Sequence, residues 1–130
     1  MRMEYQYSKR TNLPFELAVE QTISALRQEG FGIIHSIDLR QVYKEKLNVV
    51  FRNYVILGAC NPQLSYEAIL EEDKLGVFLP CNVIVQEHEN GQTEISVVNP
   101  EALMQDMEDL NLKSFATEVK SSLLHALEQL

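Results

Sequence analysis

The two cysteines of this chain, Cys60 and Cys81, are the residues with the most distinctive chemistry. Each is followed by an asparagine, and each Cys-Asn pair stands beside a proline, as Cys-Asn-Pro at residues 60–62 and Pro-Cys-Asn at residues 80–82. A thiol can act as a nucleophile, as a redox group or as a ligand for a soft metal. Because each cysteine adjoins an apolar segment with a strand pattern, we expect both to lie near one end of a sheet. The sequence therefore places a candidate ligand or metal site at this pair.

Several kinds of chemistry remain open for the pair. Cys60 comes just before a predicted helix start at Pro62, where free backbone N–H groups and the helix dipole favour a thiolate. The alternative is that both cysteines are small buried apolar residues. Two sulfurs are too few for a structural zinc site, which has four ligands, but a dimer would supply four. Two thiols could also bind copper as Cu(I) or form a reversible disulfide.

Three asparagines, Asn61, Asn82 and Asn99, are candidate ligand-binding residues because they could surround the thiols with polar groups. Each also has a structural explanation. Asn61 before Pro62 has the pattern of a helix N-cap followed by proline at the first helical position. Asn82 and Asn99 could instead satisfy backbone groups at strand ends.

The three histidines do not complete a catalytic group in the sequence. His35 lies within an apolar strand pattern and is expected to be a hydrogen-bonded core or cleft residue. His88 is expected near a hairpin tip, and His125 on the surface of the last helix. A Cys–His dyad would require the fold to bring His35 to a thiol. With no acid or base visible beside a thiol, we leave catalysis open and lean against an enzyme.

The spacing of apolar residues predicts an α+β fold. Apolar residues recur with helical spacing over residues 15–29 and again over residues 113–129. Alternating patterns predict strands over residues 3–9, 31–43, 49–59, 83–85 and 95–98, with the polar residues 41–48 as a connection. Shorter helices are predicted over residues 63–72 and 102–110. This order fits a β-α-β(4)-α plan with a short extra helix, in which a curved antiparallel sheet carries its helices on one face.

The dipeptide Asn90-Gly91 is the strongest turn signal in the chain. A two-residue turn at this position joins the last two predicted strands and fixes their register. The expected cross-strand pairs are Val83 with Val98, Asn82 with Asn99, and Glu87 with Glu94.

Composition narrows the class of protein. The 130 residues are enough for a single domain spanning residues 1–130, and 45% of them are hydrophobic, which allows a real core. The net charge of -8 argues against nucleic-acid binding, which needs clustered cations. No apolar run approaches the roughly 20 residues that span a bilayer, and the N-terminus lacks the apolar core of a signal peptide. We therefore expect a cytoplasmic protein with reduced thiols and without a membrane partner.

Four motifs together resemble a known family. They are Glu29-Gly30-Phe31-Gly32, Ile56-Leu57-Gly58-Ala59-Cys60-Asn61-Pro62, Leu79-Pro80-Cys81-Asn82-Val83 and Asn99-Pro100. From about residue 3 to its C-terminus the chain resembles a family of small bacterial and archaeal proteins classed as a domain of unknown function. The resemblance implies a fold similar to the TATA-binding-protein class, with a helix after the first strand and a long final helix. It implies no DNA binding, because a fold does not fix a function, and it offers no catalytic residues.

These observations rank three functions. The first is a small binding or sensor module with a ligand or soft-metal site near Cys60 and Cys81. The second is a homodimeric interaction or structural protein with inert cysteines, and the third is a thiol-dependent redox enzyme. A homodimer is expected in each case, because a half-covered sheet in a small domain leaves an open face or an open edge.

Overall fold

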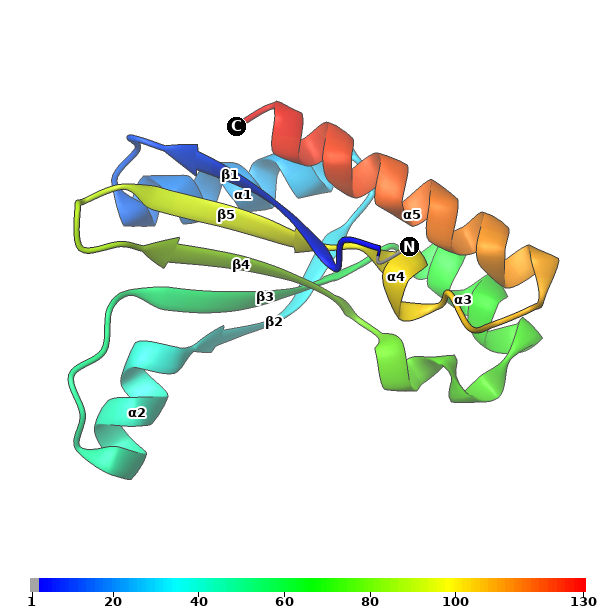
Figure 1. Ribbon diagram of the computed structural model, residues 1–130, viewed down its shortest axis with the longest axis horizontal. Coiled ribbons are helices and arrows are strands. Elements are labelled where there is room, and N and C mark those ends of the chain that lie inside the picture. Colours follow the sequence, from blue (N-terminus) through cyan, green and yellow to red (C-terminus); the bar gives the residue numbers. More distant parts are fainter. Residues whose placement is uncertain (1–2) are drawn as a thin grey trace.

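The computed structural model describes residues 3–130 and has two long helices packed on one side of a sheet (Figure 1). The described residues form the strands β1 (Gln6–Thr11), β2 (Gly32–Asp38), β3 (Tyr54–Cys60), β4 (Cys81–Glu87) and β5 (Thr93–Val98). The helices are α1 (Phe15–Gln28), α2 (Leu39–Leu47), α3 (Pro62–Glu71), the 3₁₀ helix η1 (Asp73–Phe78), α4 (Pro100–Leu103) and α5 (Leu110–Glu128).

The strands form one sheet in the order β1-β5-β4-β3-β2, and every neighbouring pair is antiparallel. The first strand therefore lies beside the last one, and β2 forms the opposite edge. The predicted α+β class, with an antiparallel sheet that carries its helices on one face, is confirmed.

Both long helices form because their apolar residues recur at helical spacing and face the sheet. The buried residues of α1 are Phe15, Ala18, Thr22, Ala25 and Leu26, and those of α5 include Leu112, Phe115, Val119, Leu123 and Leu127. They pack on alternate residues of the central strands, namely Leu57, Val83, Val85, Ile95 and Val97. Full burial of one such side chain stabilises the fold by about 1.5–3 kcal/mol.

Local capping signals fix where the shorter helices begin. The Asn61 side chain accepts a hydrogen bond from the Leu64 N–H at 3.2 Å, and Pro62 takes the first helical position of α3. Asn99 and Pro100 start α4 in the same way, with Asn99 Oδ1 accepting from the Glu101 N–H at 3.1 Å. The predicted helix over residues 102–110 is wrong in extent, because α4 ends at Leu103 and α5 begins at Leu110.

The predicted strand over residues 31–43 is wrong beyond Asp38, where the helix α2 begins. The Asp38 carboxylate accepts from the Gln41 N–H at 3.2 Å and caps the helix, which ends at the left-handed Asn48. Val42 and Tyr43 are half-buried, and the Tyr43 ring contacts Phe51, but no residue of α2 is fully buried. The strand that follows is also shorter than predicted, since residues 49–53 are irregular.

The predicted register of the hairpin is wrong by one residue, because Val83 pairs with Val97 and Gln86 pairs with Glu94. His88 and Gln92 close the turn through the His88 N–H, which donates to the Gln92 carbonyl at 2.8 Å. The loop therefore has three residues, with Gly91 at φ +84°, rather than the two that Asn-Gly also suits.

One face of the sheet has no helical layer over its centre (Figure 1). Side chains that point away from α1 and α5 come from alternate strand positions, such as Ser8 on β1, Gln86 on β4 and Ser96 on β5. This uncovered face is mainly polar. Within residues 3–130, no helix has both the length and the apolar character needed to cross a bilayer.

Candidate functional site

The two cysteines lie at the same end of the sheet, as expected. Cys81 starts β4 opposite Ala59, and Cys60 is the next residue of β3. Both line one small cavity of about 20 Å³ together with Phe31 and Phe115. A cavity of this size holds about one water molecule. The thiols are therefore neighbours, but the space between them and the helix layer accepts no organic ligand.

The environment of Cys81 is that of a protonated thiol. Its side chain is only 5% exposed, and burial, followed by repulsion from a Cys60 thiolate, raises its pKa to about 11. Cys60 is half-buried, with Sγ 3.3 Å from Ser65 Oγ. Because the Ser65 hydroxyl donates to the Pro62 carbonyl at 3.2 Å, the Cys60 S–H is the donor to Ser65 Oγ. Cys60 thus has a hydrogen-bond partner in Ser65, and burial favours the thiol form of Cys81.

The three candidate asparagines do not gather around the thiols. Asn61 lines the same small cavity and caps α3. Asn99 is fully buried, where its Nδ2 donates to the Glu4 carbonyl at 2.7 Å. Asn82 is exposed on the uncovered face of the sheet. Only Asn61 accompanies Cys60 and Cys81.

The residues around the two thiols supply too few ligands for a tetrahedral metal site. Across residues 3–130, no group of three or more His, Cys, Asp or Glu side chains converges on a point that could hold an ion. The pair alone would supply two sulfurs, which matches linear Cu(I) coordination, whereas tetrahedral zinc would need two further ligands from a second chain.

The histidines lie away from the thiol cavity and each has another neighbour. The His35 ring lies against Gly58 on the uncovered face, so that a Cβ at Gly58 would meet ring atoms at 2.5–2.8 Å. His88 and His125 each contact a glutamate, at 2.9 Å and 2.6 Å respectively.

A second hollow, much larger than the thiol cavity, lies on the uncovered face and was not predicted from the sequence. It is a groove of about 530 Å³ across β1, β5, β4 and the start of β3. Its lining residues are Tyr5, Gln6, Ser8, Tyr54, Asn82, Ile84, Gln86, Glu94, Ser96, Val97 and Val98. This volume suits a small organic molecule.

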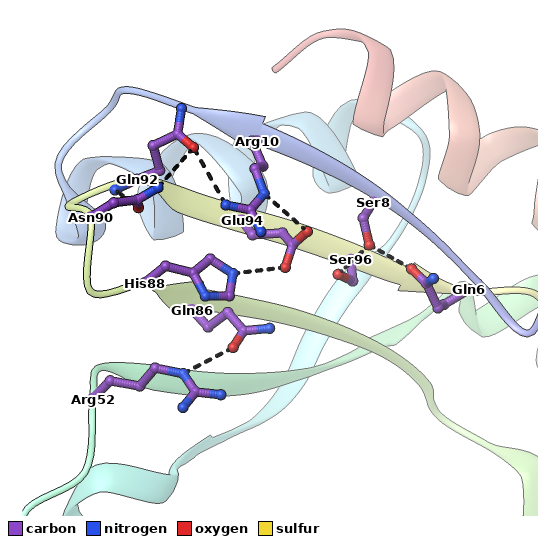
Figure 2. A network of polar contacts seen from close by, with 10 residues as sticks. All are labelled: Gln6, Ser8, Arg10, Arg52, Gln86, His88, Asn90, Gln92, Glu94 and Ser96. Carbon is purple, nitrogen blue, oxygen red and sulfur yellow. Dashed lines mark hydrogen bonds and ion pairs between the residues drawn. The ribbon is translucent and has the colours of Figure 1, made fainter.

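A chain of hydrogen bonds orders the β1 side of the groove (Figure 2). Ser8 Oγ donates to Gln6 Oε1, and Ser96 Oγ lies 2.7 Å from Ser8 Oγ. Because the Ser8 hydrogen is used on Gln6, the Ser96 hydroxyl donates to Ser8. The amide nitrogen of Gln6 stands at the end of this series of hydrogen bonds.

At the hairpin end of the groove, Glu94 lies between two cationic or donor groups (Figure 2). The Arg10 Nε is 3.6 Å from one carboxylate oxygen, and His88 Nε2 is 2.9 Å from the other. Since a carboxylate only accepts hydrogen bonds, His88 carries a hydrogen on Nε2. The negative charge of Glu94 is therefore compensated within the protein.

On the β3 side, Arg52 holds Gln86 in place (Figure 2). Arg52 Nε donates to Gln86 Oε1 at 3.0 Å, and its guanidinium lies 4.5 Å from the Phe51 ring centre and 5.8 Å from that of Tyr54. Gln86 is only 9% exposed although it faces the groove. With its oxygen engaged, its amide nitrogen is the group presented to the groove.

The signal that could have revealed this groove is the polar alternation of the strands. Asn82, Ile84 and Gln86 alternate with buried valines on β4, and Glu94 and Ser96 alternate in the same way on β5. Amide and hydroxyl side chains at central strand positions are unusual on a face that packs against helices. Their presence indicates a face reserved for polar contacts.

These features define an α+β protein whose antiparallel sheet is covered by helices on one face and grooved on the other. The chain belongs to the family described as Domain of unknown function DUF302, whose model matches residues 7–130. The resemblance expected from the cysteine motifs is thereby confirmed at the level of the family.

A solved structure of the same family supports the fold. The chain is similar to the crystal structure of an uncharacterized conserved DUF302 protein from Bacillus stearothermophilus, with 30% sequence identity and a TM-score of 0.89. The match covers 98% of each chain. No curated protein matches the sequence.

Proposed function

We propose that this protein is a binding module for a small polar molecule that lies in the groove on the uncovered face of the sheet. The observation that carries this proposal is the groove itself, about 530 Å³ in volume and lined by amides and hydroxyls on four strands. Ligand sites combine apolar surface with a few polar groups of fixed orientation. Here Ile84 and Val98 provide the apolar surface.

The hydrogen-bond pattern indicates which chemistry the ligand presents. The amide oxygens of Gln6 and Gln86 accept hydrogen bonds from Ser8 and Arg52, which leaves both amide nitrogens directed to a ligand. Asn82 adds a third amide at the groove. Donors in these positions complement an oxygen acceptor, so we infer a ligand with a carboxylate or amide carbonyl.

The orientation of these groups is already fixed without a ligand. Gln86 and Ser96 are 9% and 8% exposed, and each is held by a neighbouring strand or by Arg52. A site with fixed donors loses less side-chain entropy on binding than a site with mobile ones. This arrangement supports recognition rather than a merely solvated surface.

The experiment follows the side-chain amide signals of Gln6, Asn82 and Gln86 by nuclear magnetic resonance during titration with acetate, acetamide and N-acetylglycine. We expect saturable shifts at these three amides. Asn82→Trp should abolish them by filling the groove from an exposed strand position. The matched control, Gln21→Trp, adds the same ring on the exposed side of α1 and should leave them intact. Absence of saturable shifts, or equal shifts in both variants, contradicts the proposal.

The thiol pair supports a second candidate function, in which Cys60 and Cys81 bind a soft metal or sense an oxidant. The supporting observation is that both sulfurs line one cavity at the end of β3 and β4. Cu(I) is the metal that suits two sulfurs without a third ligand. Free thiols in this arrangement suit a reducing compartment such as the cytoplasm.

Anaerobic titration with Cu(I) tests this second function. One equivalent should bind to the native chain, and Cys60→Ser and Cys81→Ser should each remove binding. The matched control is Ser65→Ala, which changes the neighbour of Cys60 and keeps both sulfurs. If either cysteine variant binds Cu(I) as the native chain does, the cysteines are inert in this respect.

A further inference from the structure

The segment 39–52, which we call the arm, projects from the body of the molecule. It contains α2 and the irregular residues that lead to β3, and Figure 1 shows α2 standing apart from the helix layer. No residue of α2 is buried. Leu47, Val49 and Val50 at its tip are exposed, Val50 by 85%. An exposed apolar tip on a helix that has no buried residue indicates a surface for another molecule.

The charge of the arm is opposite to that of the rest of the chain. The arm contains four cations, Arg40, Lys44, Lys46 and Arg52, and one acid, Glu45. The remaining residues contain seven cations and eighteen acids. The arm is therefore attracted to acidic surfaces and repelled by a second arm.

The surface of this protein that complements the arm is a groove of about 290 Å³ between α3 and α5, which we call the acidic groove. Glu67, Glu71 and Glu118 lie along it, and Leu64 and Phe115 provide apolar surface inside it. Exposed leucines, Leu70 on α3 and Leu110 at the start of α5, lie on the same two helices. The acidic groove thus offers negative charge and apolar area together, as the arm offers positive charge and apolar area.

The arm cannot fill the acidic groove of its own chain, because α2 and α3 lie at opposite ends of the molecule (Figure 1). A second copy that is turned by a two-fold axis would bring each arm beside the other copy's acidic groove. Such a contact is made twice and closes, whereas arm against arm and groove against groove would each bring like charges together.

We propose that this protein forms a two-fold homodimer in which the arm of each copy docks into the acidic groove of the other. The proposal does not require a ligand on the uncovered face, although Arg52 at the end of the arm also holds Gln86 there. It identifies the partner as a second copy because the opposite charges and the apolar surfaces occur on one chain.

Sedimentation equilibrium of two charge-reversed variants tests the contact. The arm variant is Lys44→Glu with Lys46→Glu, and the groove variant is Glu67→Lys with Glu118→Lys. None of these four side chains makes a hydrogen bond or ion pair within the described chain. Each variant alone should dimerise at least about tenfold more weakly than the native chain. A 1:1 mixture should recover the dimer, because each arm then meets a groove of opposite charge.

The control is Arg27→Glu with Lys74→Glu, which removes two exposed cations outside the arm and should leave the dimer intact. Raised salt should weaken the native dimer, since the contact rests partly on charge. Recovery in the mixture also shows that the arm variant is folded, because an unfolded arm could not be rescued. A monomeric native chain at tens of micromolar, an unrecovered mixture, or growth into larger oligomers overturns the proposal.

Discussion

The buried side chain of Asn99 is the most direct test of how this fold is held together. Its Nδ2 donates to the Glu4 carbonyl at 2.7 Å, and its Oδ1 accepts from the Glu101 N–H at 3.1 Å. One side chain therefore ties the segment before β1 to the start of α4. We predict that Asn99→Ala destabilises the protein strongly and changes ligand binding only through stability.

The expected size follows from the three contributions that the truncation removes. Loss of the helix cap costs about 1 kcal/mol. Loss of the bond to the Glu4 carbonyl costs about 1 kcal/mol, and more if that carbonyl stays without a partner. The space left by a fully buried side chain adds about 1 kcal/mol. The free energy of unfolding should therefore fall by about 2–4 kcal/mol.

Urea denaturation followed by circular dichroism measures this loss, and a second variant separates its causes. Asn99→Asp keeps an oxygen acceptor for the Glu101 N–H but replaces the donor to Glu4 with an acceptor. It should therefore retain the cap and lose the tie to the N-terminal segment. A loss below about 1 kcal/mol for Asn99→Ala would refute the structural role and return Asn99 to the list of ligand-binding candidates.

Three further predictions follow from other residues. Gly58→Ala should destabilise the protein by about 1 kcal/mol in urea denaturation, because its new Cβ meets the His35 ring. This cost should vanish in a His35→Ala background, and equal costs in both backgrounds would contradict the packing. In the Cys60→Ser variant, iodoacetamide at pH 8 should modify Cys81 at least about tenfold more slowly in the folded protein than in the protein unfolded by urea. Equal rates in the two states would contradict the raised pKa of Cys81. The hydrogen bond to Glu29 raises the pKa of His125, so its stabilisation is complete below the unfolded value of 6.5 and is lost as the pH rises through the folded pKa. The urea midpoint should therefore fall from pH 6 to pH 8 by more in the native chain than in Glu29→Gln, and parallel curves would refute the pairing.

Local signals predicted those parts of the fold that depend on near neighbours in sequence. The apolar stripes of α1 and α5 and the Asn61-Pro62 start of α3 were sufficient, because capping and amphipathicity act within a few residues. The prediction that the two cysteines lie at one end of the sheet was also correct, because each cysteine adjoins the end of a predicted strand. The burial of Cys81, which raises its pKa, depends on α5 and could not be inferred locally.

The errors arose where one pattern fits two structures. Residues 37–40 alternate as a strand would, but Asp38 can also cap a helix, and the end of pairing with β3 decides between the two. Asn90-Gly91 suits both a two-residue and a three-residue loop, and the second gave the observed register. The groove was missed because its residues come from four strands that are far apart in sequence.

The pairing of β1 with β5 determines when this fold can be completed during synthesis. Ser8 and Ser96 contact each other across these strands although 88 residues separate them along the chain. β1 therefore has no partner until the hairpin has left the ribosome, and closing so long a loop slows folding relative to local contacts. Before closure, β5 presents an open edge that carries Ile95 and Val97, and such an edge pairs readily with another chain. Crowded synthesis should therefore favour exchange of β1 between nascent copies, which makes the rate of β1 docking a determinant of the yield of folded protein.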